Sequence, residues 1–218
     1  EKQVAALKVQ KDTTSNTDSS IALAAGAKLK VGDGTNPGVV LLASNGGSNG
    51  HTFNAITGAG TLDFGTSEGV FLMPKRSNPS YTPTATISAR ISGENGVTFA
   101  GVPSSDNASA NRLLALSGDN DFTGGAIVEH AMVYATSATA FGTNEVTVKG
   151  GHWHGATVGF PTAGMTYAND FRIRGNGFYM INRETASETA FGGVAVGALR
   201  FAWDRSVISQ RQLHDARS

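Results

Sequence analysis

The sequence predicts an all-β protein whose short strands are wound into a right-handed parallel β-helix, also called a β-solenoid. Short segments with alternating apolar residues recur along the chain, and turns rich in glycine and asparagine separate them. The period of an amphipathic helix is hard to find. A β-sandwich is the alternative fold, because it also combines many short strands with frequent turns.

Apolar residues two positions apart mark the expected strands. Residues i and i+2 of a strand face the same side, so each pair supplies one buried face. The pairs are Leu7 and Val9, Ile21 and Leu23, Leu29 and Val31, Leu62 and Phe64, Val97 and Phe99, Leu114 and Leu116, Val146 and Val148, Val158 and Phe160, Phe171 and Ile173, and Leu199 and Phe201. We expect Phe64, Phe99, Leu116, Val148 and Phe201 to point into the core.

Turn clusters separate these pairs, for example at residues 32–34, 45–50, 117–120 and 175–177. Glycine and asparagine are favoured there because they tolerate positive φ angles. A β-branched residue, a glycine turn and a new strand follow one another from Ile56, Ile91 and Ile173 at irregular spacing. Parallel solenoids show this pattern when loop insertions stretch the period. We expect residues 74–83 and 103–111 to form such projecting loops.

Composition excludes several classes of protein. The chain has 218 residues, 28 of them glycine, and a formal net charge of zero, which gives no attraction to nucleic acid or to anionic lipid. The best apolar run, residues 39–43, is far shorter than the ~18 residues of a membrane helix. No cysteine is present, so disulfides and zinc–thiolate sites are excluded. The chain starts at Glu1 without a signal-like segment, and we expect a mature or trimmed form.

Few residues suggest chemistry. His152 and His154 would face one side of a strand and are weak candidates for a metal site, which needs further ligands. Asp119 and Asp121 flank Asn120 within a turn cluster, where such side chains bond their own backbone. No motif for nucleotide binding or for a serine nucleophile is present. We therefore expect no enzymatic activity, no catalytic residue and no cofactor.

Residues 114–151 carry a specific pattern. Leu114, Leu116, Gly118, Asn120, Phe122, Thr123, Gly124 and Gly125 are followed by Ala140, Gly142 and residues 146–151. This block resembles the autotransporter-associated β-strand repeat of large bacterial secreted and surface proteins. It departs from the family pattern at residues 129–131, where a small polar turn with glycine is usual. We interpret a set of its polar and glycine residues as turn-makers: Gly118, Asn120, Gly124, Gly125, Gly150 and Gly151.

The resemblance implies a secreted or cell-surface location in bacteria. We expect one solenoid domain over residues 1–201 and a C-terminal cap or partner-contacting segment over residues 202–218. The predicted function is that of an adhesin-like structural scaffold that binds surface glycans or associates end to end into filaments, without insertion into a membrane. A carbohydrate-active β-helix enzyme or a glycan-binding module is the alternative, because such sites assemble in space from scattered acidic residues.

Overall fold

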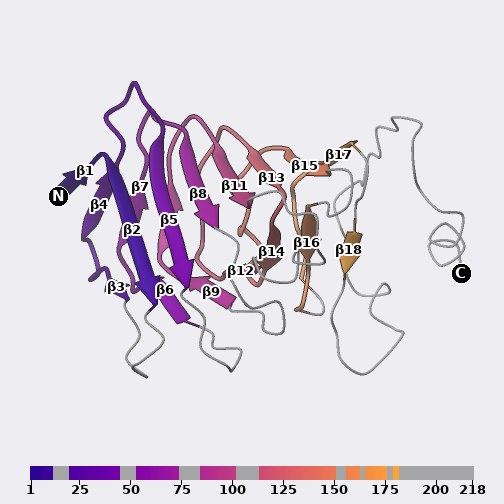
Figure 1. Cartoon of the computed structure of the whole chain (residues 1–218), viewed down its shortest axis with the longest axis horizontal. Helices are drawn as coiled ribbons and strands as arrows, with labels where there is room; N and C mark the ends of the chain where they lie inside the picture. The colour runs from indigo at the N-terminus through magenta and orange to yellow at the C-terminus, as the bar shows by residue number, and fades with distance from the viewer. Residues whose placement is uncertain are drawn as a thin grey trace, which may run out of the picture.

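The computed structural model describes residues 1–11, 20–44, 53–73, 84–101, 113–150, 156–162, 165–175 and 179–181. These residues form strands and connections, with no helix among them, and every strand pair is parallel. The strands build three sheets, A, B and C, that stack into a solenoid (Figure 1). The prediction of a parallel β-helix is therefore confirmed, and the alternative prediction of a β-sandwich is wrong.

Each turn of the solenoid, here called a coil, adds strands to the sheets in the order A, B, C. Sheet A contains β1 (Lys2–Val4), β4 (Lys28–Val31), β7 (Thr61–Asp63) and β10 (Arg90–Ser92). Sheet B contains β2 (Ala6–Lys11), β5 (Gly38–Ser44), β8 (Gly69–Met73), β11 (Val97–Gly101), β13 (Ala126–Glu129), β15 (Val146–Gly150) and β17 (Phe171–Gly175). Sheet C contains β3 (Ile21–Ala22), β6 (Phe53–Thr57), β9 (Thr84–Ile87), β12 (Leu113–Leu116), β14 (Met132–Ala135), β16 (Thr157–Gly159) and β18 (Tyr179–Ile181).

Sheet A ends at β10 within the described part of the chain, but the solenoid continues. In the next coil the segment after β12 takes the place of a strand. The Asp121 amide donates to the Ile91 carbonyl at 3.0 Å, and the Thr123 amide donates to the Gly93 carbonyl at 2.9 Å. These parallel-type hydrogen bonds keep the coils in register without a regular strand.

A column of aromatic rings fills the interior. Phe71 lies between Phe64, at a ring-centroid distance of 5.7 Å, and Phe99, at 5.3 Å. Phe99 contacts Phe141, which contacts Phe171, with centroids 6.5 and 6.0 Å apart. Edge-to-face and stacked pairs at these distances add to the free energy gained by burial. The column thus links coils that are distant in sequence.

The predicted core positions are confirmed where the structure describes them. Phe64, Phe99, Leu116 and Val148 are all at most 1% exposed. Phe201 lies outside the described residues, as do the proposed cap at residues 202–218 and the predicted loops at 74–83 and 103–111.

One buried polar side chain in the core is fully paired. Tyr167 is 0% exposed, and its hydroxyl donates to the Ala135 carbonyl at 2.7 Å. Burial disfavours the phenolate and raises the pKa of Tyr167 to about 12. The side chain therefore stays neutral at physiological pH and keeps its hydrogen bond.

The turn between β13 and β14 is the place where the sequence departs from the repeat pattern. His130 has a φ angle of 50°, in the left-handed region that glycine usually occupies. The backbone thus adopts a glycine-like conformation although a larger residue is present.

Candidate functional site

Asn120 holds three coils together where sheet A ends. Its side chain is 3% exposed. Oδ1 accepts a hydrogen bond from the Ile91 amide at 2.8 Å, and Nδ2 donates to the Ala140 carbonyl at 2.7 Å. One amide group thus satisfies a backbone donor of the preceding coil and a backbone acceptor of the following coil. This geometry gives Asn120 a structural role.

The glycines of the same block allow the coils to approach closely. A Cβ atom on Gly124 would lie 2.1 Å from the Gly96 nitrogen, and one on Gly118 would lie 2.5 Å from the Ala89 oxygen. Gly125 has a φ angle of 87°. Gly150 ends β15 and pairs with Gly175 in β17. Gly151 lies outside the described residues.

The weak metal candidates, His152 and His154, also lie outside the described residues. Within the described ranges, no group of three or more histidine, aspartate or glutamate side chains could hold a metal ion.

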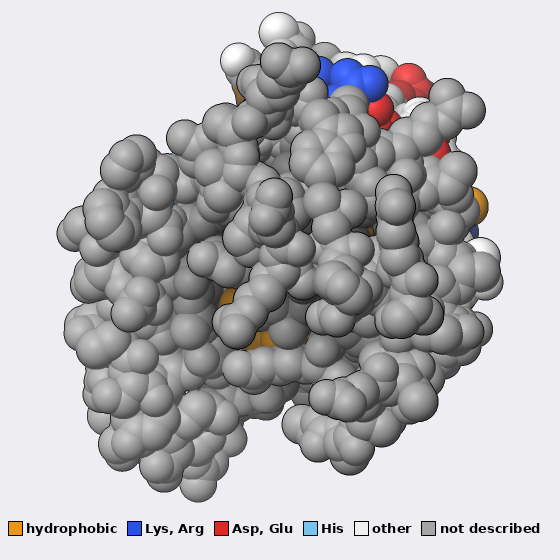
Figure 2. Space-filling view, turned by 90° about the vertical axis from the view of Figure 1, so that its right-hand side faces the viewer, with side chains coloured by type: hydrophobic (Ala, Val, Ile, Leu, Met, Phe, Trp, Pro, Cys, Tyr) orange, Lys and Arg blue, Asp and Glu red, His pale blue; other side chains and the backbone are white. Residues whose placement is uncertain are grey.

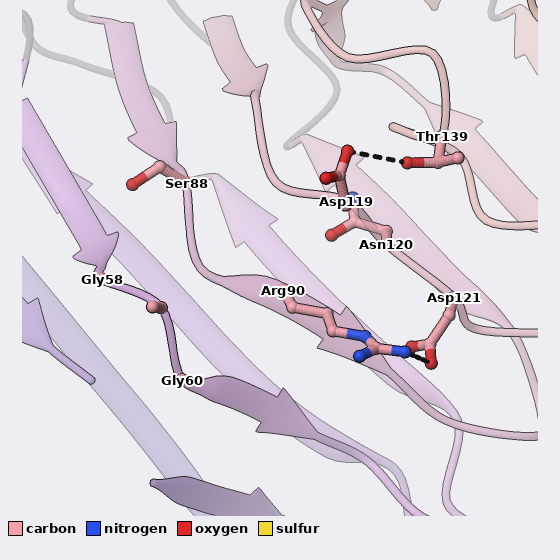
Figure 3. Close-up of a pocket in the computed structure, with 9 residues that line it drawn as sticks. Gly58, Gly60, Ser88, Arg90, Asp119, Asn120, Asp121 and Thr139 are labelled. Atoms are coloured by element: carbon pink, nitrogen blue, oxygen red, sulfur yellow. Dashed lines mark hydrogen bonds and ion pairs between the residues drawn. The ribbon is translucent and has the colours of Figure 1, made fainter. Parts of the chain in front are cut away.

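A polar hollow of about 520 Å³ lies at the corner where the chain passes from sheet C to sheet A (Figure 3). Three successive coils contribute to it through the segments that follow β6, β9 and β12, and the next coil adds one residue. Its lining consists of Gly58, Ala59, Gly60, Ser88, Arg90, Asp119, Asn120, Asp121 and Thr139. Short corner segments stacked by the parallel register therefore create the site.

Arg90 and the two aspartates dominate the electrostatics of the hollow. Arg90 Nη2 forms an ion pair with Asp121 Oδ2 (Figure 3). The hydrogen bond and the charge of Asp121, followed by the charge of Asp119, raise the pKa of Arg90. The Arg90 and Asp121 side chains are 51% and 40% exposed, so the pair adds little to stability. It remains accessible to a ligand.

Both carboxylates have hydrogen-bonding capacity left over. Asp119 Oδ1 lies 3.4 Å from the hydroxyl oxygens of Ser137 and Thr139, at the long end of the hydrogen-bond range. Asp121 Oδ1 is a buried atom without a hydrogen-bond partner among the described residues. The hollow thus combines acceptors, a guanidinium and hydroxyls, a set that fits a ligand rich in hydroxyl groups.

Other acidic residues are dispersed over the surface. Asp63 pairs with Lys28 at 3.2 Å and accepts from the Gly65 amide, while Glu68 accepts from the Thr98 hydroxyl at 2.5 Å. At the C-terminal end, charged side chains of both signs meet along the upper edge of the view in Figure 2. Glu145 forms an ion pair with Arg172, at 2.9 Å. These residues lie outside the lining of the hollow.

The fold and the hollow define a β-solenoid protein with a polar corner site. Among the described residues, no helix is long and apolar enough to cross a membrane. No family model, no curated protein and no solved structure matches the chain.

Proposed function

We propose that this chain is a structural segment of a bacterial secreted or cell-surface protein, an adhesin-like scaffold that displays loops. One observation carries the proposal. Residues 12–19, 45–52, 74–83 and 102–112 each connect a strand of sheet B to the next strand of sheet C. Because those strands stack in register, the ends of β2, β5, β8 and β11, after which the four insertions follow in the sequence, lie at one corner of the solenoid, one coil apart, at a spacing of about 4.8 Å.

The same corner is also made with a minimal connection. Between β13 and β14, only His130 and Ala131 join sheet B to sheet C. Long insertions are therefore not needed to turn the chain here. Their polar composition, with serine, threonine and asparagine prominent, suits contact with an external partner.

The location and the kind of protein are supported by the block at residues 114–151, which resembles the autotransporter-associated repeat. Binding of surface glycans and association end to end into filaments belong to this proposal. Open edges of β-sheets present unpaired backbone groups and act as templates for pairing.

Shortening the insertions tests the scaffold function. We expect a variant with residues 102–112 replaced by a two-residue connection to keep its far-ultraviolet circular dichroism spectrum, because the neighbouring coil turns with two residues. Adhesion of bacteria that display the chain to mucin and to extracellular-matrix proteins should fall at least fivefold. A variant with two residues inserted at His130 is the control. The insertions at residues 12–19, 45–52 and 74–83 are shortened in the same way. Unchanged adhesion of all four shortened variants, each correctly folded, would contradict the proposal.

The polar hollow favours a second candidate function, a glycan-binding or carbohydrate-active site. Asp119, Asp121 and Arg90 converge there from two coils. We expect the Asp119→Asn/Asp121→Asn variant to lose binding on an array of neutral and acidic glycans, or release of reducing ends, at least tenfold. The control is Glu94→Gln, an exposed acid outside the hollow. Absence of binding and of cleavage by the parent chain would eliminate this candidate.

A further inference from the structure

The outer face of sheet B is largely apolar from β5 to β11 and continues to Ile127 in β13. Strand register aligns its outward residues in two columns. The first column contains Lys8, Leu41, Leu72, Ala100 and Glu129, and the second contains Ala6, Val39, Val70, Thr98 and Ile127. Leu72 is 39% exposed, and it is the large apolar side chain that stands out as exposed among the described residues.

The outward surface of sheet A differs from this one. The outer side of sheet A carries Lys28, Lys30, Asp63 and Arg90, and its ion pairs face solvent. On sheet B the branched residues Val39, Leu41 and Val70 are only half-buried, although their strand neighbours Val40 and Phe71 already fill the core. An apolar surface that continues across coils indicates a partner.

We propose that the outer face of sheet B is the contact surface of a homodimer, in which two copies pack face to face about a twofold axis parallel to the strands. The axis passes over β8. It places β8 on β8, β5 on β11, and β2 on β13 of the second copy. Two aligned sheets pack in this way at about 10 Å.

Charge complementarity selects this arrangement. Within the first column, the axis brings Leu72 of one copy against Leu72 of the other, and Leu41 of one copy against Ala100 of the other. At both ends of that column, Lys8 of one copy then faces Glu129 of the other, so the symmetry creates two ion pairs around an apolar centre. The formal net charge of zero adds no long-range repulsion between copies.

An axis parallel to the solenoid is disfavoured by the same residues. It would place the two columns against each other in the same coil. Arg172 and Arg174 occupy the outward positions of β17. Arg172 of one copy would therefore face Arg174 of the other, and the two positive charges would repel each other. With the axis over β8, these arginines lie beyond the five coils that overlap.

The absence of cysteine allows a sharp cross-linking test. In the Lys8→Cys/Glu129→Cys variant, the two positions of one chain lie four strand spacings apart, about 19 Å, which is too far for a disulfide, or for a cross-link of about 10 Å, within the chain. We expect a bismaleimide cross-linker matched to the sheet spacing of about 10 Å to give a covalent dimer in high yield. The Lys8→Cys/Lys149→Cys variant, which tests a pairing shifted by one coil, should give less than a tenth of that yield. Equal yields, or none, would overturn the proposed arrangement.

Solution mass and charge reversal complete the test. Light scattering should give twice the 22.5 kDa of one chain, and Leu72→Asp should weaken dimerisation at least a hundredfold, while Ala115→Asp on sheet C should not. Lys8→Glu should weaken it about tenfold, and adding Glu129→Lys should restore it. Circular dichroism confirms that each variant is folded. A monomer at every concentration, including one in which the chain itself covers Leu72, would overturn the proposal, as would a dimer that Leu72→Asp leaves intact.

Discussion

Replacing Phe71 with alanine should lower the free energy of unfolding by about 3–5 kcal/mol. The ring is 0% exposed and lies between Phe64 and Phe99 in the aromatic column. Its removal deletes buried apolar surface and two ring contacts. The cavity cannot close easily, because hydrogen bonds to β5 and β11 hold β8 on both sides. Urea denaturation followed by circular dichroism measures the loss.

Two comparisons make the Phe71 result specific. Phe71→Leu keeps much of the volume and should cost clearly less than Phe71→Ala. Thr86→Ala, at a half-buried outward position of β9, should change stability by less than about 0.5 kcal/mol. If Phe71→Ala cost no more than Thr86→Ala, the aromatic column would not be a main source of stability.

Replacing Asn120 with leucine should destabilise the chain by about 2–4 kcal/mol, because two buried backbone groups lose their partners. The groups are the Ile91 amide and the Ala140 carbonyl. Leucine has nearly the same shape, so the loss reports the hydrogen bonds and not a change in packing. Because Asn120 connects coils, we also expect a less cooperative transition, measured by the slope of the urea curve.

Further substitutions separate the two hydrogen bonds. Asn120→Asp keeps an acceptor for the Ile91 amide but offers a proton to the Ala140 carbonyl only when the carboxyl group is protonated. Folding therefore raises the pKa of that carboxyl group above its unfolded value, and the stability of the variant should increase as the pH falls toward about 3.9, the pKa of an aspartate in the unfolded chain. Asn144→Leu, at an exposed asparagine, should cost much less. A loss equal to that of Asn120→Leu would show that burial is not decisive.

The fold was predictable because most coils contain at least one strand with a visible alternation. Leu62 and Phe64, or Val146 and Val148, alternate with polar residues, so their inward face can be recognised. β5 and β8 could not be recognised in this way. Their outward residues are apolar as well, which hides the period of two. The apolar outward residues of these two strands also distinguish the outer face of sheet B.

The candidate site was only partly predictable. Asp119 and Asp121 stand out as neighbours in the chain, but Arg90 is about 30 residues away, and only the register of the coils brings it to Asp121. The register depends on how much chain each insertion consumes, and no local pattern gives that length. The role of Asn120 has a similar origin, because both of its backbone partners belong to other coils.

The insertions between sheets B and C have a practical consequence. They vary in length, yet the strands before them, β5, β8 and β11, pair without a register shift, and the pair β6–β9 after them shows one irregularity, between Asn54 and Ile56. The entropy of closing a loop grows only slowly with its length, so a longer insertion costs little. This corner is therefore suited to the insertion of foreign peptides. Epitopes grafted into neighbouring coils would start from points about 4.8 Å apart.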